Sequence, residues 1–203
     1  MIEAVCFFSQ DSGPLVLLPR EALPFWEGND PPSSGRVVDA ISRWDDQETA
    51  TDYDRACDVI AWAEVLPVGP DSWGLVLPED AGGIAWLSPD DRPGTFALVQ
   101  CLILDAEALS SYDRLFSQAM EDESGWTTLQ ENLTVGGNGL LLMPAASRSD
   151  ETREIAWGRA AQIGTAQAVP LPEGLYSVDQ FVVPGSEDEA AGVIFTRFRQ
   201  SVP

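Results

Sequence analysis

Short apolar segments, bounded by glycine, proline or acidic residues, recur along most of the chain. Runs of this kind are typical of β-strands. They predict strands at residues 3–8, 15–18, 59–68, 73–77, 84–87, 95–104, 133–135, 140–143, 167–169, 174–183 and 191–199. Too few helical segments alternate with these runs for parallel βαβ units, so the pattern favours a mainly antiparallel sheet.

Two turns in this pattern predict β-hairpins. Gly69-Pro70-Asp71-Ser72 separates segment 59–68 from segment 73–77, and Gly136-Gly137-Asn138-Gly139 separates 133–135 from 140–143. Both turns are rich in residues that favour tight reversals of the chain. We therefore expect the strands on either side of each turn to pair with each other.

One segment has the periodicity of an amphipathic helix, from about 106 to 120. Asp105 stands at its N-cap, and an apolar stripe follows at helical spacing, formed by Leu109, Tyr112, Leu115, Phe116 and Met120. Short extra helices are expected at 21–26, 37–44 and 145–158. The predicted fold class is α+β: a mainly antiparallel β-sheet with one main helix.

The length and composition fit one domain. The chain has 203 residues, of which 44% are apolar, and no internal repeat. Residues 27–51 contain Pro31-Pro32, several acids and few apolar anchors. The sequence therefore predicts a single domain over 1–203 with a mobile acidic loop at 27–51.

The charge balance changes the range of expected partners. There are 33 acidic residues against 11 basic ones, all arginine, which gives a net charge of −22. Such a field repels phosphate backbones and anionic membranes and attracts basic proteins or metal ions. We expect no nucleic-acid and no membrane partner. Alternatively, the acidity reflects only an acidic proteome, because net charge concerns solubility and steering and not the fold.

The residue types that are missing exclude several kinds of catalysis. The chain contains no histidine and no lysine, which excludes Ser–His–Asp and Cys–His catalysis, Schiff-base chemistry, P-loop sites and His-ligated zinc. The acidic pairs Asp45-Asp46 and Asp90-Asp91 match no calcium-loop motif. We expect no enzyme activity, no cofactor and no metal. Carboxylate chemistry of the glycoside hydrolase type stays open, because carboxylates can pair in space.

The cysteines and the N-terminus indicate a cytoplasmic protein. Cys6, Cys57 and Cys101 are far apart and odd in number, and each lies in an apolar stretch. We expect reduced and mostly buried thiols. The first residues lack the basic region of a signal peptide, and no segment reaches the length of a membrane span.

Acids and aromatic residues gather between the predicted loop and the next strand. The motif at 51–58 has two interpretations. In a binding site, Arg55 would orient a carboxylate. In a structural role, Thr51 and Asp54 form a capping box, and Arg55 forms a local salt bridge. Trp44 and Trp73 stand beside acids at loop edges, where a tryptophan can anchor a partner, whereas Trp62 and Trp86 are expected in the core. The candidate partner-binding residues are Trp44, Asp45, Asp46, Asp52, Tyr53, Asp54, Arg55 and Trp73.

Several motifs, in order along the chain, resemble immunity protein family 21 of bacterial polymorphic-toxin systems. They are Ser12-Gly13-Pro14-Leu15-Val16-Leu17-Leu18-Pro19 with Leu23 and Trp26, Asp52-Tyr53-Asp54-Arg55-Ala56-Cys57 with Val65-Leu66-Pro67-Val68-Gly69, Ala85-Trp86-Leu87, and Leu171-Pro172-Glu173-Gly174-Leu175-Tyr176-Ser177-Val178. The resemblance implies a non-catalytic protein that binds and blocks a cognate toxin domain. Acidity would steer it towards a basic toxin. The alternatives are a carboxylate-based enzyme, or an acidic DNA mimic or adaptor outside a toxin operon.

Overall fold

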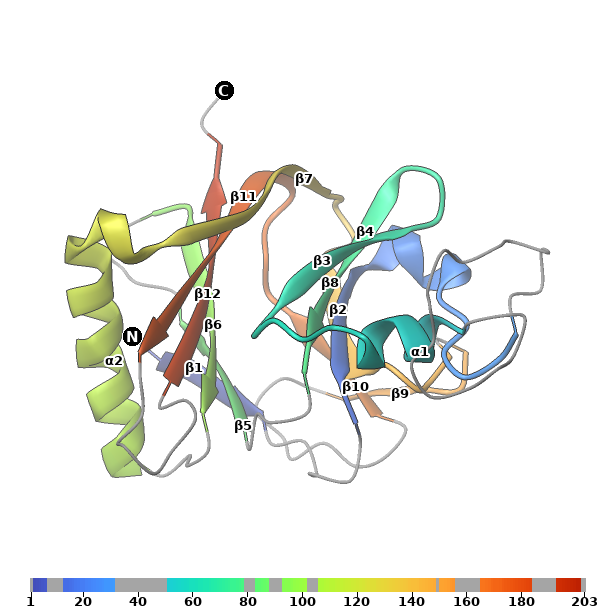
Figure 1. Ribbon diagram of the computed structural model, residues 1–203, viewed down its shortest axis with the longest axis horizontal. Helices are drawn as coiled ribbons and strands as arrows, with labels where there is room; N and C mark the ends of the chain where they lie inside the picture. The colour runs from blue at the N-terminus through green and yellow to red at the C-terminus, as the bar shows by residue number, and fades with distance from the viewer. Residues whose placement is uncertain are drawn as a thin grey trace.

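The protein is built of two six-stranded β-sheets that pack face to face, with helices on both outer faces (Figure 1). The computed structural model describes residues 2–6, 13–31, 51–78, 83–87, 93–101, 106–148, 150–155, 165–183 and 193–201. Strands dominate and nearly all pair antiparallel, which confirms the predicted α+β class with a mainly antiparallel sheet.

Sheet A has the strand order β1-β5-β6-β12-β11-β7, and all its pairs are antiparallel. Its strands are β1 (Ile2–Cys6), β5 (Gly83–Leu87), β6 (Thr95–Cys101), β12 (Val193–Gln200), β11 (Gly174–Val183) and β7 (Thr127–Val135). The long helix α2 (Ala106–Glu121) covers its outer face and leads into the short 3-10 helix η3 (Glu123–Gly125). The main predicted helix is thus confirmed, while its expected N-cap, Asp105, lies outside the described residues.

Sheet B has the order β3-β4-β2-β8-β10-β9, and only the β9–β10 pair is parallel. Its strands are β3 (Glu64–Val68), β4 (Ser72–Leu77), β2 (Leu15–Pro19), β8 (Leu140–Pro144), β10 (Thr165–Val169) and β9 (Arg153–Ile155). The 3-10 helix η2 (Arg20–Phe25) and the helix α1 (Asp52–Cys57) cover its outer face.

Helices on the outer face explain why the two central strands of sheet B, β2 and β8, are apolar at every position. In β2, Leu15 and Leu17 point into the core between the sheets, whereas Val16 and Leu18 pack beneath η2 and α1. Successive side chains of a strand point to opposite faces, so a strand covered on both faces loses the polar half of its alternation.

One of the two predicted hairpins is wrong. The turn at Gly69 joins β3 to β4, which pair as expected. The turn from Gly136 to Gly139 is also present, and the Gly139 amide donates to the Gly136 carbonyl over 3.0 Å. However, β7 pairs with β11 in sheet A, and β8 pairs with β2 and β10 in sheet B. The glycine turn therefore carries the chain from one sheet to the other.

Two further expectations need correction. The predicted strand at 59–68 begins only at Glu64, and residues 59–63 form a loop. In this loop Trp62 is half-buried and is not a core residue, whereas Trp86 is fully buried as expected. Within the described part of 145–158 there are turns and the strand β9 instead of a helix. The expected helix at 37–44 lies outside the described residues.

The expectation of buried thiols is tested at one position. Cys57, at the end of α1, is half-buried. The side chains of Cys6 and Cys101 lie outside what the structure describes, so their burial remains a prediction.

Candidate partner-binding site

Helix α1 begins with the capping box that the spacing of its residues predicts. The Thr51 hydroxyl accepts a hydrogen bond from the Asp54 amide over 3.1 Å. Asp54 Oδ2 in turn accepts from the Thr51 amide and the Thr51 hydroxyl, over 2.7 Å each. These bonds satisfy backbone donors that a helix start leaves unpaired. A helix of only six residues depends on such contacts, since it is too short to be stable alone.

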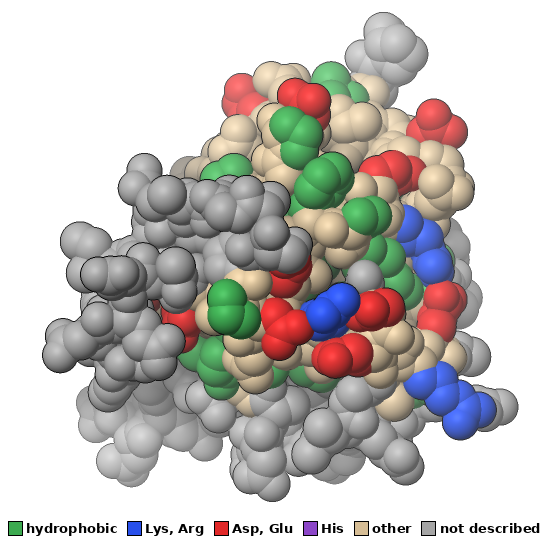
Figure 2. Space-filling view, turned by 90° about the vertical axis from the view of Figure 1, so that its right-hand side faces the viewer, with side chains coloured by type: hydrophobic (Ala, Val, Ile, Leu, Met, Phe, Trp, Pro, Cys, Tyr) green, Lys and Arg blue, Asp and Glu red, His purple; other side chains and the backbone are tan. Residues whose placement is uncertain are grey.

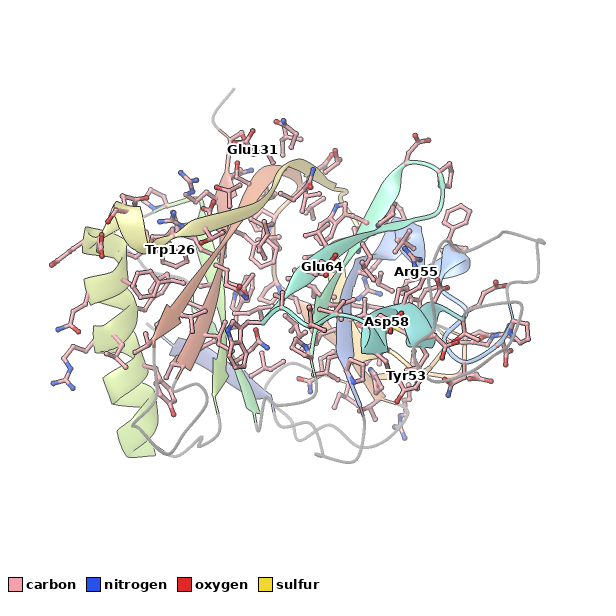
Figure 3. All side chains as sticks on the ribbon, viewed as in Figure 1. Tyr53, Arg55, Asp58, Glu64, Trp126 and Glu131 are labelled. Carbon is pink, nitrogen blue, oxygen red and sulfur yellow. The ribbon has the colours of Figure 1, made fainter. Side chains whose placement is uncertain are left out.

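Asp52 and Arg55, of which Figure 3 labels Arg55, tie α1 to its neighbours. Arg55 Nη1 lies 3.0 Å from Asp52 Oδ1, and Arg55 Nη2 donates to the Pro67 carbonyl in β3 over 2.8 Å. The other oxygen of Asp52 accepts from the Glu27 amide over 3.0 Å. Both side chains are nearly buried. The local salt bridge that the structural interpretation predicts for Arg55 is thus present. Beyond it, the pair joins the chain after η2, the helix and the edge strand β3.

Tyr53 fixes the same helix from another side. Its amide donates to the Gly28 carbonyl over 3.0 Å. Its ring lies close against Gly13, where an added Cβ would be 2.8 Å from the Tyr53 hydroxyl. The four candidate residues Asp52 to Arg55 thus lie together on α1, and each has an identifiable structural contact.

We expect replacement of Thr51 by alanine to lower the free energy of unfolding by about 1 kcal/mol, because it removes one half of the capping box. Urea denaturation of Thr51→Ala beside wild type measures the change. Thr127→Ala, at an exposed position of β7, serves as a matched control and should stay within about 0.5 kcal/mol of wild type. Equal losses in the two variants would show that the cap contributes nothing.

The remaining candidates lie elsewhere. Trp44, Asp45 and Asp46 fall outside the described residues. Trp73 is buried in the core between the sheets, and its indole N–H donates to the Thr134 carbonyl in β7 over 2.9 Å. The expectation of Trp73 at an accessible loop edge is therefore corrected: it belongs to the contact between sheet B and sheet A. Its position depends on how the sheets stack, which the sequence around it does not reveal.

A surface feature that the sequence analysis missed lies directly after α1. Ile60, in the loop from α1 to β3, is 80% exposed and has Asp58 before it and Glu64 after it. Figure 3 shows Asp58 at the end of α1 and Glu64 at the start of β3. Figure 2 shows the right-hand side of the molecule in Figure 1, where acidic side chains lie beside basic and hydrophobic ones. The only signal in the sequence was a continuous apolar run, which was interpreted as a strand.

A second group of charges lies on sheet A, below the end of α2. Arg197 and Asp179 are each only 1% exposed and are paired over 3.0 Å. Arg197 also bonds Glu123 in η3, and its guanidinium carbon lies 3.9 Å from the ring centroid of Trp126. The partners come from two other segments, the region of η3 and the strand β11, which is why the local pattern in β12 could not reveal them.

The electrostatics of this group favour the ionised form of Asp179. Burial raises the pKa of the Asp179 carboxyl, but hydrogen bonds from Arg199 over 2.7 Å and from Thr128 over 2.9 Å, with the charges of both arginines, lower it more strongly. The net pKa of Asp179 is below its ordinary value. The same contact raises the pKa of Arg199, first through its hydrogen bond to Asp179. The group is therefore a network of matched charges that attaches η3 and β7 to β11 and β12.

Two other kinds of site are absent from the described ranges. No group of three or more histidine, cysteine, aspartate or glutamate side chains there is arranged to hold a metal ion. None of the described helices is long and apolar enough to cross a membrane.

The comparisons with known proteins give one match. The model of the family described as Immunity protein 21 matches residues 7–189. This range includes η2, α1, the loop that carries Ile60 and the edge strand β3. No curated protein and no solved structure matches the chain.

Proposed function

We propose that this chain, which belongs to the immunity protein 21 family, protects the cell that makes it by binding a cognate toxin domain and blocking its action. The observation that carries the proposal is the family match over 7–189, which includes all of sheet B and four of the six strands of sheet A. Blocking by occupation of a surface requires no catalytic group. It therefore suits a chain without histidine or lysine, and we propose that the protein acts in the cytoplasm without enzyme activity.

The proposed binding surface is the outer face of sheet B around residues 51–72. Residues 51–72 contain five acidic residues and one arginine, and Arg55 is already engaged by Asp52 and the Pro67 carbonyl. The exposed charge of this region is therefore negative, and a basic toxin domain complements it. From the sequence alone, the proposed surface also includes Trp44, Asp45 and Asp46.

Growth protection tests the proposed function directly. Cells that produce the toxin domain encoded beside this chain's gene should stop growing, and production of this chain should restore growth. The two purified proteins should also form a stable complex. Loss of growth despite a folded immunity chain, together with no complex, would contradict the proposal.

We expect association with that toxin domain to slow by about tenfold or more between low and physiological ionic strength, because salt screens the long-range attraction between opposite charges. Stopped-flow fluorescence at a series of salt concentrations measures the association rate constant. Dissociation should change much less, because short-range contacts dominate it. An association rate independent of salt would mean that the acidic surface does not steer the partner.

A further inference from the structure

The loop between α1 and β3 is fixed at both ends and presents an apolar side chain at its middle. Val59 is buried in the cluster beneath α1, and Ala63 is buried in the core between the sheets. Between these two anchors, Ile60 is 80% exposed and Trp62 is half-buried. Since the anchors hold the loop from both sides, Ile60 is displayed at a defined place on the surface.

A single exposed isoleucine is ordinary on a protein surface, so its surroundings decide its meaning. Phe25, which is 43% exposed, packs at the other end of β3, where an added Cβ on Gly69 would lie 2.7 Å from its ring. Ile60 and Phe25 thus flank an edge strand of five residues, about 17 Å long. An interface of standard size buries about 800 Å² on each partner, which is large enough to include both side chains.

The charges around Ile60 select the kind of partner. Asp58 and Glu64 stand on either side of it, and Glu64 is exposed. Asp58 Oδ1 is buried, and no hydrogen-bond donor among the described residues reaches it. Arg55, the only basic residue between Thr51 and Ser72, uses its guanidinium for Asp52 and the Pro67 carbonyl. Within the described residues, Ile60 therefore stands between two acidic residues in the sequence, and Arg55 pairs with neither of them.

We propose that Ile60 is the apolar anchor of the toxin-binding interface and that Asp58 and Glu64 form its acidic border. The inference rests on the proposed function and commits to one occupant, a toxin domain that presents an apolar hollow bordered by arginine or lysine. Apolar anchors surrounded by charged residues, which exclude water from the contact, carry much of the energy of tight interfaces.

The test compares Ile60→Ala with Leu175→Ala in binding to the purified toxin domain encoded beside this chain's gene. Leu175 is a matched control because it is an aliphatic side chain, 39% exposed, on β11 of the other sheet. We expect Ile60→Ala to raise the Kd about thirtyfold, equivalent to about 2 kcal/mol, and Leu175→Ala to leave it within about twofold. Both melting temperatures should stay close to that of wild type, because neither side chain is in the core.

A charge variant separates the border from the anchor. Glu64→Gln should slow association several-fold with little change in dissociation, whereas Ile60→Ala should act mainly on dissociation. If wild type binds and Ile60→Ala binds equally well, or if Leu175→Ala weakens binding as much, the inference is overturned while the proposed function stands. If wild type does not bind the toxin domain, both are overturned.

Discussion

Replacement of Asp179 by alanine is expected to lower the free energy of unfolding by about 3–5 kcal/mol, the usual range for removing one partner of a buried ion pair. Among the described residues, the variant would leave Arg197, which is 1% exposed, with Glu123 as its acidic partner, and the side chain of Glu123 is largely in solvent. The desolvated guanidinium would keep its stacking on Trp126, but this contact cannot replace a buried counter-charge. Urea denaturation followed by tryptophan fluorescence measures the loss.

Arg199 provides the matched control for this network. It also bonds Asp179, but its side chain is 46% exposed, so solvent screens the interaction. Arg199→Gln should therefore cost about 1 kcal/mol or less. A loss in Arg199→Gln as large as that in Asp179→Ala would show that the buried pair is not the source of the effect.

The pH dependence of stability tests the role of Asp179 in a second way. The pKa of Asp179 in the folded protein is lowered from an ordinary value of about 3.9, so the folded state binds this proton less readily than the unfolded state. The carboxylate thus stabilises the fold fully above about pH 4, and this contribution disappears as the pH falls through the lowered pKa. The stability difference between wild type and Asp179→Asn should be largest near neutrality and should shrink in acid.

This network and the proposed binding surface belong to different sheets. Arg197, Asp179 and Arg199 lie on β11 and β12 of sheet A, whereas α1, Ile60 and β3 lie on the outer side of sheet B. Residues that share no contacts usually act independently. The Asp179 variants should consequently lower stability while each folded molecule retains its affinity for the toxin domain, which distinguishes damage to the fold from damage to the interface.

Much of the fold could be predicted because its signals are local. The strand β2 is apolar at every position and ends at a proline, and α2 carries a stripe at helical spacing. The partner of each strand is a non-local property. The four-residue turn from Gly136 to Gly139 looks the same whether it joins two strands of one sheet or carries the chain between sheets, so the sequence alone predicted the wrong pairing.

The candidate site divides in the same way. Thr51, Asp54 and Arg55 act within one turn of their own helix, and their roles follow from spacing. In contrast, Trp73 donates to a carbonyl 61 positions away, and Arg197 meets partners 74 and 18 positions away. The exposure of Ile60 was not predicted, because an apolar run is normally buried. Val59 and Ala63 in this run are buried, but Ile60 between them faces solvent.

The tight contact at Gly28 gives the second large expected effect. Gly28 has a φ of +59°, and an added Cβ would lie 2.5 Å from the backbone oxygen of Ala146. A backbone atom at this distance cannot move aside as a flexible side chain would. Around it, the Asn29 amide donates to the same oxygen over 3.1 Å, and the Gly28 carbonyl accepts from the Tyr53 amide. The left-handed conformation and the close approach should therefore both penalise a side chain here.

Gly139 separates these two causes. It also has a positive φ, +74°, but the nearest atom to an added Cβ is 3.8 Å away, which is an ordinary contact. Gly139→Ala should cost about 1–2 kcal/mol, the penalty of a left-handed conformation alone. Gly28→Ala should cost about 3 kcal/mol or more, because overpacking against backbone adds about 1–3 kcal/mol. If urea denaturation shows equal losses of stability in the two variants, the backbone around Gly28 shifts to accept the added Cβ at no further cost in stability. If Gly28→Ala loses more stability than Gly139→Ala and its folded fraction also binds the toxin domain more weakly, the contact at Gly28 also positions α1 for its partner.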